Sequence, residues 1–166
     1  MPTQRPPWFG RVPSTGGSCA IDSRFAYPFG GIAMIRYATL GTNNLENATV
    51  FYNRVLAPLD LHPTPFSNET FYGRKGAASE EVVLAVTLPF DGAPATHGNG
   101  TMIALHAASK QQVDAAYSAA MAQGGQCEGA PGPRPDYHPR MYVAYFRDLD
   151  GNKLAVVHFE PVRDKH

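Results

Sequence analysis

The chain contains few of the features that would assign a function directly. Its two cysteines, Cys19 and Cys127, are too few for a disulfide framework and favour a reducing, cytoplasmic location. The 14 basic residues equal the 14 acidic ones, so electrostatics give no reason to expect nucleic acid or an anionic membrane as partner. The longest apolar stretches, such as residues 82–90, are too short to span a bilayer.

The motifs of the common enzyme classes are also missing. The chain has no G-x-S-x-G, no H-E-x-x-H, no paired C-x-x-C and no phosphate-binding loop. No two of its six histidines have metal-ligand spacing on one expected helix or strand. The run D-L-D-G-N at residues 148–152 resembles part of a calcium loop but lacks the remaining acidic ligands, so it predicts a tight hairpin turn.

Residues 1–33 differ in composition from the rest of the chain. They contain five Gly, five Pro and the only Trp, with no periodic apolar pattern. This composition predicts a poorly ordered extension, and the alternative is an arm that packs on a partner through its aromatic side chains. The folded domain is expected to cover residues 34–160, followed by a short tail at 161–166.

The domain contains two copies of one pattern. Residues 39–61 and 104–126, which start 65 positions apart, each begin with the end of an apolar strand, pass a polar helix cap and continue into an amphipathic helix. A Gly- and Pro-rich linker separates a first module at 34–91 from a second at 100–160. The sequence thus predicts an α+β domain of two βαβββ modules, with its site between the halves.

Periodicity and capping residues give the bounds of the expected elements. In the first module we expect a strand at 35–40, a helix from the Asn43 and Asn44 caps to Pro58, and strands at 61–67, 70–75 and 82–88. In the second we expect a strand at 101–106, a helix from Ser109 to Gly124, a short strand at 126–128, a loop at 129–139, and a hairpin of 140–148 with 153–159.

The loop at 129–139 concentrates polar side chains. Arg134, Asp136, Tyr137 and His138 place a cation, an acid, a phenol and an imidazole within five residues. Such a loop between strands is a candidate binding site. The alternative is a rigid connection framed by prolines.

These patterns together resemble a known superfamily. The helix F-Y-N-R-V-L-A-P-L at 51–59, the turn R-D-L-D-G-N at 147–152 and the repeated βαβββ order are similar to the glyoxalase/bleomycin-resistance/extradiol-dioxygenase superfamily, also called vicinal oxygen chelate proteins. The resemblance covers about residues 34–160. It implies two facing half-barrels that form one pseudo-symmetric domain and hold a divalent metal by His and Glu side chains.

This chain lacks suitable side chains where the resemblance implies metal ligands. Those positions fall on Tyr37, Met102, Ala155 and the segment 84–86. Phenol and thioether groups are poor ligands for hard divalent ions, and alkyl side chains cannot ligate. We therefore expect the fold to be kept and neither a metal nor another cofactor to be bound.

A half-barrel without the metal would be mostly apolar and would suit a small aromatic or amphipathic molecule. Its expected lining is Tyr37, Thr39, Met102, Ala104, Tyr142, Ala155 and Val157, with Arg134, Tyr137 and His138 at the mouth. Three functions stay open: a metal-free ligand-binding protein, a glyoxalase-like lyase or isomerase with His138 or Tyr37 as general acid or base, and an interaction module with a filled cavity. The resemblance also implies a possible homodimer.

Overall fold

A computed structural model describes residues 35–74 and 81–161. The first module contains β1 (Ala38–Gly41), α1 (Leu45–Leu56), a short 3-10 helix η2 (Ala57–Leu59), β2 (Leu61–Phe66), β3 (Glu69–Arg74) and β4 (Val82–Thr87). The second contains β5 (Ile103–His106), α2 (Lys110–Ala122), β6 (Gln126–Pro133), β7 (Met141–Arg147) and β8 (Lys153–Phe159). The predicted order, βαβββ twice, is confirmed. The prediction about residues 1–33 lies outside the described residues.

Both helices begin at the predicted caps. The Asn44 side chain accepts a hydrogen bond from the backbone N–H of Asn47, and Ser109 accepts one from Gln112. Gln112 Oε1 reaches back to the N–H of Ala108, 2.6 Å away, and so satisfies a second free donor at the start of α2. Past the end of α2, Gly124 has a φ of +89°, a conformation that favours glycine.

Each module forms its own four-stranded mixed sheet. The strand orders are β1-β4-β3-β2 in the first sheet and β5-β8-β7-β6 in the second. Within the described residues neither sheet closes into a barrel. The parallel pairs are equivalent, with Leu40 opposite Val86 in the first sheet and Leu105 opposite Val156 in the second. The repeat found in the sequence is thus a repeat of structure.

Three expected strand boundaries differ, since β1 starts at Ala38, β5 starts at Ile103 and β6 extends further than expected. The segment 129–139 was predicted as a loop because of its glycines and prolines, but β6 continues to Pro133. The strand tolerates this composition because it is the edge strand of its sheet and because its pairing with β7 is irregular on both sides of Gly129. An edge strand can carry proline, and a bulge absorbs residues that do not fit the ladder.

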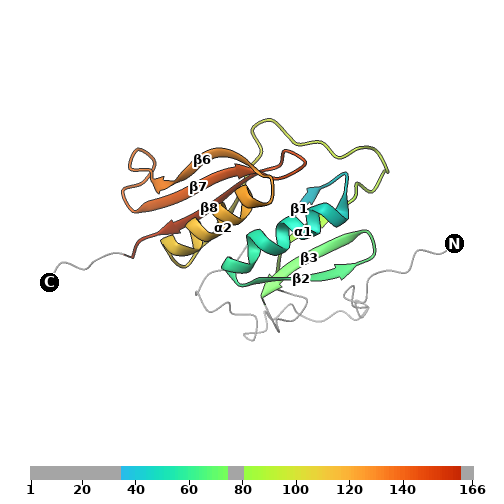
Figure 1. The fold of residues 1–166 in the computed structure, drawn as a ribbon, viewed down its shortest axis with the longest axis horizontal. Helices are drawn as coiled ribbons and strands as arrows, with labels where there is room; N and C mark the ends of the chain where they lie inside the picture. Colours follow the sequence, from blue (N-terminus) through green and yellow to red (C-terminus); the bar gives the residue numbers. More distant parts are fainter. Residues whose placement is uncertain (1–34, 75–80, 162–166) are drawn as a thin grey trace, which may run out of the picture. The chain divides into compact units, whose positions relative to one another are not determined.

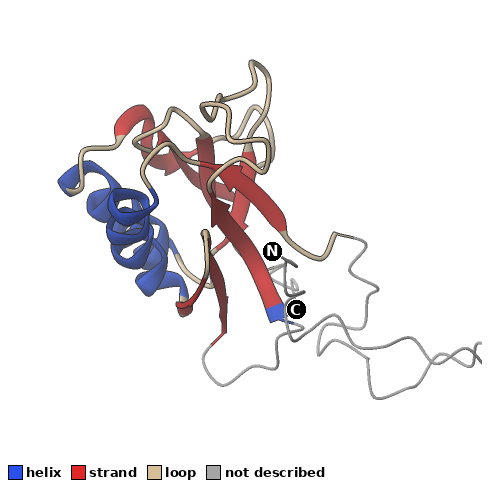
Figure 2. Ribbon diagram, turned by 90° about the vertical axis from the view of Figure 1, so that its right-hand side faces the viewer, coloured by secondary structure: helices blue, strands red, loops and turns tan. Residues whose placement is uncertain are grey.

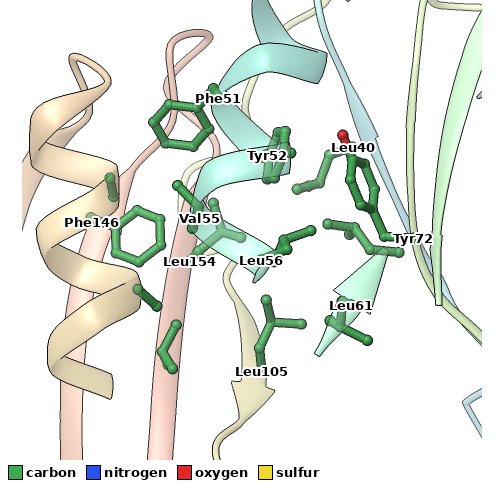
Figure 3. Packing of buried hydrophobic residues seen from close by; sticks show 14 of the residues in the cluster. Leu40, Phe51, Tyr52, Val55, Leu56, Leu61, Tyr72, Leu105, Phe146 and Leu154 are labelled. Atoms are coloured by element: carbon green, nitrogen blue, oxygen red, sulfur yellow. The ribbon is translucent and has the colours of Figure 1, made fainter. Parts of the chain in front are cut away.

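The core lies where the helices pack against the sheets. Figure 1 shows α1 and α2 side by side, and Figure 2 shows both on the same side of the strands. One apolar cluster contains residues of both modules, and Figure 3 shows Phe51, Val55 and Leu56 of α1 close to Phe146 and Leu154 of the second sheet. The two modules therefore share one core.

A polar network also joins the modules, at the turn between β7 and β8. The Asp148 carboxylate accepts hydrogen bonds from the Tyr52 hydroxyl and, within the turn, from the backbone and side chain of Asn152 and the N–H of Asp150. Asp150 accepts from the Thr42 hydroxyl at 2.6 Å. These oxygens serve the hairpin and the contact between modules. The predicted hairpin turn is confirmed, since β7 and β8 pair antiparallel on either side of it. No helix of the described chain is long and apolar enough to cross a membrane.

Candidate functional site

Each sheet has one face packed against the helices and a second face turned away from them, here called the far face. Side chains alternate along a strand, so the buried Leu40 and Leu105 mark the helix side. Their neighbours Thr39 and Ala104 lie on the far faces. Both are exposed, which makes the far faces the candidate site.

The far face of the first sheet contains two of the predicted lining residues. Tyr37, directly before β1, is 45% exposed, and Thr39 pairs with Ala85 of β4. Ala85 lies in the segment 84–86, where the resemblance implied an acidic metal ligand, and it pairs in turn with Phe71 of β3. This part of the face is therefore aromatic and alkyl in character.

The same face also carries a carboxylate that sequence reasoning missed. Glu69 lies on β3 opposite Thr87 of β4 and Phe66 of β2. Burial raises the pKa of the Glu69 carboxyl above its usual value. No contact of this group with a cation is present in the described part of the chain. Its position in an alternating strand, two residues from Phe71, is the sequence signal that would have found it.

The far face of the second sheet contains four predicted lining residues. Met102, directly before β5, is 43% exposed, and Ala104 pairs with Ala155 of β8. Ala155 pairs with Tyr145 of β7, so two alanines and a phenol form one row across the sheet. The next row contains Val157, beside the exposed His106.

Tyr142 does not share this face. It alternates with Tyr145 to the helix side of β7, and its hydroxyl donates a hydrogen bond of 2.9 Å to Asp114 of α2. That hydrogen bond raises the pKa of the Tyr142 phenol. The sequence pattern around β7 predicts that side chains alternate between the two faces. It does not indicate whether Tyr142 or Tyr145 faces the helix. His158 also lies on the helix side, with Nδ1 3.0 Å from the Ala107 carbonyl oxygen.

The polar loop sends its side chains to different places. Arg134 folds back along β6, with its guanidinium 5.9 Å from the centre of the Tyr145 ring. His138 packs edge-on against Phe159 at a centroid distance of 5.2 Å, and its Nδ1 accepts from the backbone N–H of Arg140, which leaves the proton on Nε2. Tyr137 is 77% exposed. Arg134 and His138 thus both reach the far face of the second sheet, in different rows.

The surroundings of Tyr145 are the most polar part of either far face. Lys153 Nζ lies 5.9 Å from the centre of its ring, as the Arg134 guanidinium does. Glu128 of β6 accepts from Arg147 Nε at 2.6 Å and from Lys153 Nζ at 3.0 Å. These two hydrogen bonds lower the pKa of the Glu128 carboxyl, so it stays ionised. Tyr145, Arg147, Lys153 and Glu128 were not predicted as site residues, because their contacts join three strands and depend on a register that the sequence does not show.

The side chains on the far faces do not suit the divalent metal that the resemblance implied. The residues at the expected ligand positions are Tyr37, Ala85, Met102 and Ala155. Across residues 35–74 and 81–161 no three His, Cys, Asp or Glu side chains come together as a metal site. The donor set on the far faces therefore does not fit such an ion.

Comparison with known sequences decides the family. The sequence model of the Glyoxalase/Bleomycin resistance protein/Dioxygenase superfamily matches residues 34–156. The chain belongs to this superfamily. No curated protein matches the sequence. The match covers both modules of the glyoxalase-like domain and leaves out only the last residues of β8.

Solved structures of glyoxalase-like proteins have the same fold. A glyoxalase/bleomycin resistance protein from Albidiferax ferrireducens T118 is 35% identical, with a TM-score of 0.69, over 76% of this chain and 99% of that one. A lactoylglutathione lyase from Agrobacterium tumefaciens is 20% identical, with a TM-score of 0.52, over 78% of this chain and 100% of that one. The fosfomycin resistance protein FosX from Listeria monocytogenes is 18% identical, with a TM-score of 0.54, over 76% of this chain and 93% of that one. The last two likenesses concern the fold alone.

Proposed function

We propose that this chain binds a small aromatic or amphipathic molecule between its two βαβββ modules, on their far faces, without the divalent metal of its superfamily. The observation that carries the proposal is the chemistry at the four implied ligand positions. They hold a phenol, a thioether and two methyl groups, at Tyr37, Met102, Ala85 and Ala155. These groups suit contact with an apolar ring better than coordination of a hard cation.

Exposure of large side chains supports binding at this place. Tyr37 and Met102, which adjoin the edge strands β1 and β5, are each more than 40% exposed. Large apolar side chains left exposed on the far face of each sheet support interaction with a ligand there. Arg134 and His138 add polar groups at the second sheet, which is typical of ligand sites that are apolar with a few placed polar groups.

A binding assay with a blocked far face tests the proposal. A panel of neutral, cationic and anionic aromatic compounds is screened against the full chain by calorimetry. We expect at least one compound to saturate at one per chain. Ala104→Trp fills the far face of the second sheet and should abolish this binding, whereas Ala122→Trp, on the exposed side of α2, should leave it unchanged. Equal loss in both variants, or no saturating compound, would sink the proposal.

The metal-free state has its own test. Elemental analysis of the purified protein and a thermal melt with and without chelator are compared. We expect less than stoichiometric metal and the same melting temperature in both melts. One zinc, nickel, iron or manganese per chain, together with a chelator-sensitive melt, would contradict the proposed metal-free site.

The second candidate function is a lyase or isomerase reaction. The observation that favours it is the position of His138, whose imidazole packs against Phe159 on the far face of the second sheet and would serve there as general acid or base. Catalysis predicts that His138→Ala abolishes turnover of a bound compound while its affinity and the fold persist. Pure binding predicts a stoichiometric complex with no turnover in either protein.

We also propose a cytoplasmic protein that forms homodimers. The low cysteine count supports the compartment, and the superfamily resemblance supports the assembly. Light scattering of the full chain at several concentrations measures the assembly directly. A monomer at every concentration would contradict it.

A further inference from the structure

We propose that the far face of the second sheet is a subsite for an anionic group, so that the ligand is an aromatic acid, and that Arg134 is the residue that holds its carboxylate. This deepens the proposed function and rests on it. The inference starts from how the Arg134 side chain is held. Its Nη1 donates to the carbonyl oxygen of Pro133 at 3.0 Å, and its Nη2 donates to that of Ala130 at 2.9 Å.

These two bonds orient the guanidinium without neutralising it. Both acceptors are backbone carbonyls, and no carboxylate contacts Arg134 in residues 35–74 and 81–161. A guanidinium has five N–H donors, so three remain, including Nε–H. Arginine with free donors in a fixed plane is suited to bidentate binding of a carboxylate.

Two glycines of β6, Gly129 and Gly132, lie next to the Arg134 guanidinium. A Cβ on Gly132 would lie 3.0 Å from Arg134 Nη1, and a Cβ on Gly129 would lie 3.0 Å from Tyr145 Cδ2 and 3.5 Å from Arg134 Nη2. A side chain at Gly132 would displace the flexible end of Arg134 slightly, and one at Gly129 would crowd the Tyr145 ring. The two glycines of β6 thus leave room for the guanidinium to lie close to the strand beside Tyr145.

The charge around Tyr145 favours an anion. Arg134, Arg147 and Lys153 bring three positive charges, and Glu128 brings one negative charge. Glu128 bonds both Arg147 and Lys153, so Arg134 is the cation of this group without an acidic partner in the described chain. The far face of the first sheet carries Glu69 instead. An anionic group would therefore be attracted to the second sheet and repelled from the first.

Ala104, at the end of the same row, offers an exposed contact for an aromatic ring. Ala155 of β8 and Ala104 of β5 follow Tyr145 in this row, and each has only a methyl side chain. Ala104 is exposed, whereas Ala155 is 1% exposed, so a ring would lie on Ala104 and over its neighbours. Neighbouring strands are about 4.8 Å apart, so the row from β5 to β6 spans roughly 14 Å. That length accommodates a two-ring compound whose carboxylate reaches Arg134.

Binding of a matched acid and amide tests this inference. Naphthalene-2-carboxylate and naphthalene-2-carboxamide have the same rings and differ in charge. Calorimetric titration of the full chain should give a Kd for the acid at least about tenfold below that for the amide, the range of a charged hydrogen bond. Arg134→Gln should remove this preference. The control Lys110→Gln, which removes a cation on α2 paired with Glu160, should retain it.

Each other outcome has a definite meaning. If acid and amide bind the wild type equally, the anionic subsite is wrong and the proposed ligand binding stands. If neither binds and no compound of the wider panel does, both proposals fail. If the preference for the acid survives in folded Arg134→Gln, another residue holds the carboxylate. The comparison of acid and amide in the wild type does not depend on the folding of any variant.

Discussion

The hydroxyl of Tyr52 donates a hydrogen bond of 2.6 Å to Oδ2 of Asp148, and this bond joins α1 of the first module to the β7–β8 turn of the second. Both side chains are buried. Asp148 is fixed in addition by the N–H groups of Asp150 and Asn152, so the turn presents its oxygen to Tyr52 in a set position. A charged acceptor in a buried place makes this one of the stronger hydrogen bonds between the modules.

Tyr52→Phe should therefore destabilise the protein by about 1.5–3 kcal/mol, the range for a hydrogen bond to a charged group. The free energy of unfolding in urea measures it. Tyr72→Phe is the matched control, since it removes the hydroxyl of a second fully buried tyrosine that bonds the neutral Asn53 at 3.1 Å inside the first module. We expect a loss of about 0.5–1.5 kcal/mol there. A larger loss in Tyr72→Phe would contradict the importance of the contact between modules.

The Tyr52 phenol should also make the free energy of unfolding change with pH in the alkaline range. Burial, and next the Asp148 charge, raise the pKa of Tyr52 well above its usual value. A tyrosine in the unfolded chain titrates near pH 10. Because the folded pKa is the higher one, its contribution is fully present below about pH 10 and is lost as the pH rises towards the folded pKa. The stability difference between wild type and Tyr52→Phe should shrink from pH 9 to pH 11 in urea melts. A constant difference would contradict this.

Much of the fold was predictable because it depends on local signals. Helical spacing predicts an apolar stripe on α1 made of Leu45, Ala48, Phe51, Tyr52, Val55 and Leu56. The last five are buried, and Leu45 is partly buried against the same core. The end of β6 was not predictable from the same signals. Its glycines and prolines are local markers of a loop, and the tertiary position of β6 as an edge strand overrides them.

The site was predictable only in part, for a related reason. Because side chains alternate between the two faces of a strand, the sequence places Thr39 on the same face as Tyr37 and Ala104 on the same face as Met102. Which face meets the helices in β7 depends on packing, and Tyr142 was therefore assigned to the wrong side. The cluster around Tyr145 joins residues of three strands, with Glu128 and Lys153 25 positions apart. Such contacts follow from register, which the sequence does not show.

Glu69 and Glu128 should respond oppositely to acid. Burial raises the pKa of Glu69, so its folded pKa exceeds the unfolded value near 4.3. Its favourable contribution is present below that value and is lost as the pH rises, and Glu69→Gln should stabilise the protein at pH 7 but not at pH 3.5. The hydrogen bonds from Arg147 and Lys153 lower the pKa of Glu128, so Glu128→Gln should destabilise at pH 7 and lose this effect in acid. Urea melts at both pH values measure the differences, and effects of the same sign would contradict the assignment.

The close packing of the two modules should depend on small side chains on the buried side of α2. Ala116 and Ala120 are fully buried in the core shared by both modules, alongside Phe51 of α1. Ala120→Leu adds three carbons to a filled space and should cost about 1–3 kcal/mol, because neighbours must move or adopt unfavourable rotamers. Ala122→Leu makes the same change on the exposed side of the helix and should stay within about 0.5 kcal/mol of wild type. Urea unfolding measures both. Equal costs would mean that the two helices are not packed tightly, and the shared core would then not hold the modules together.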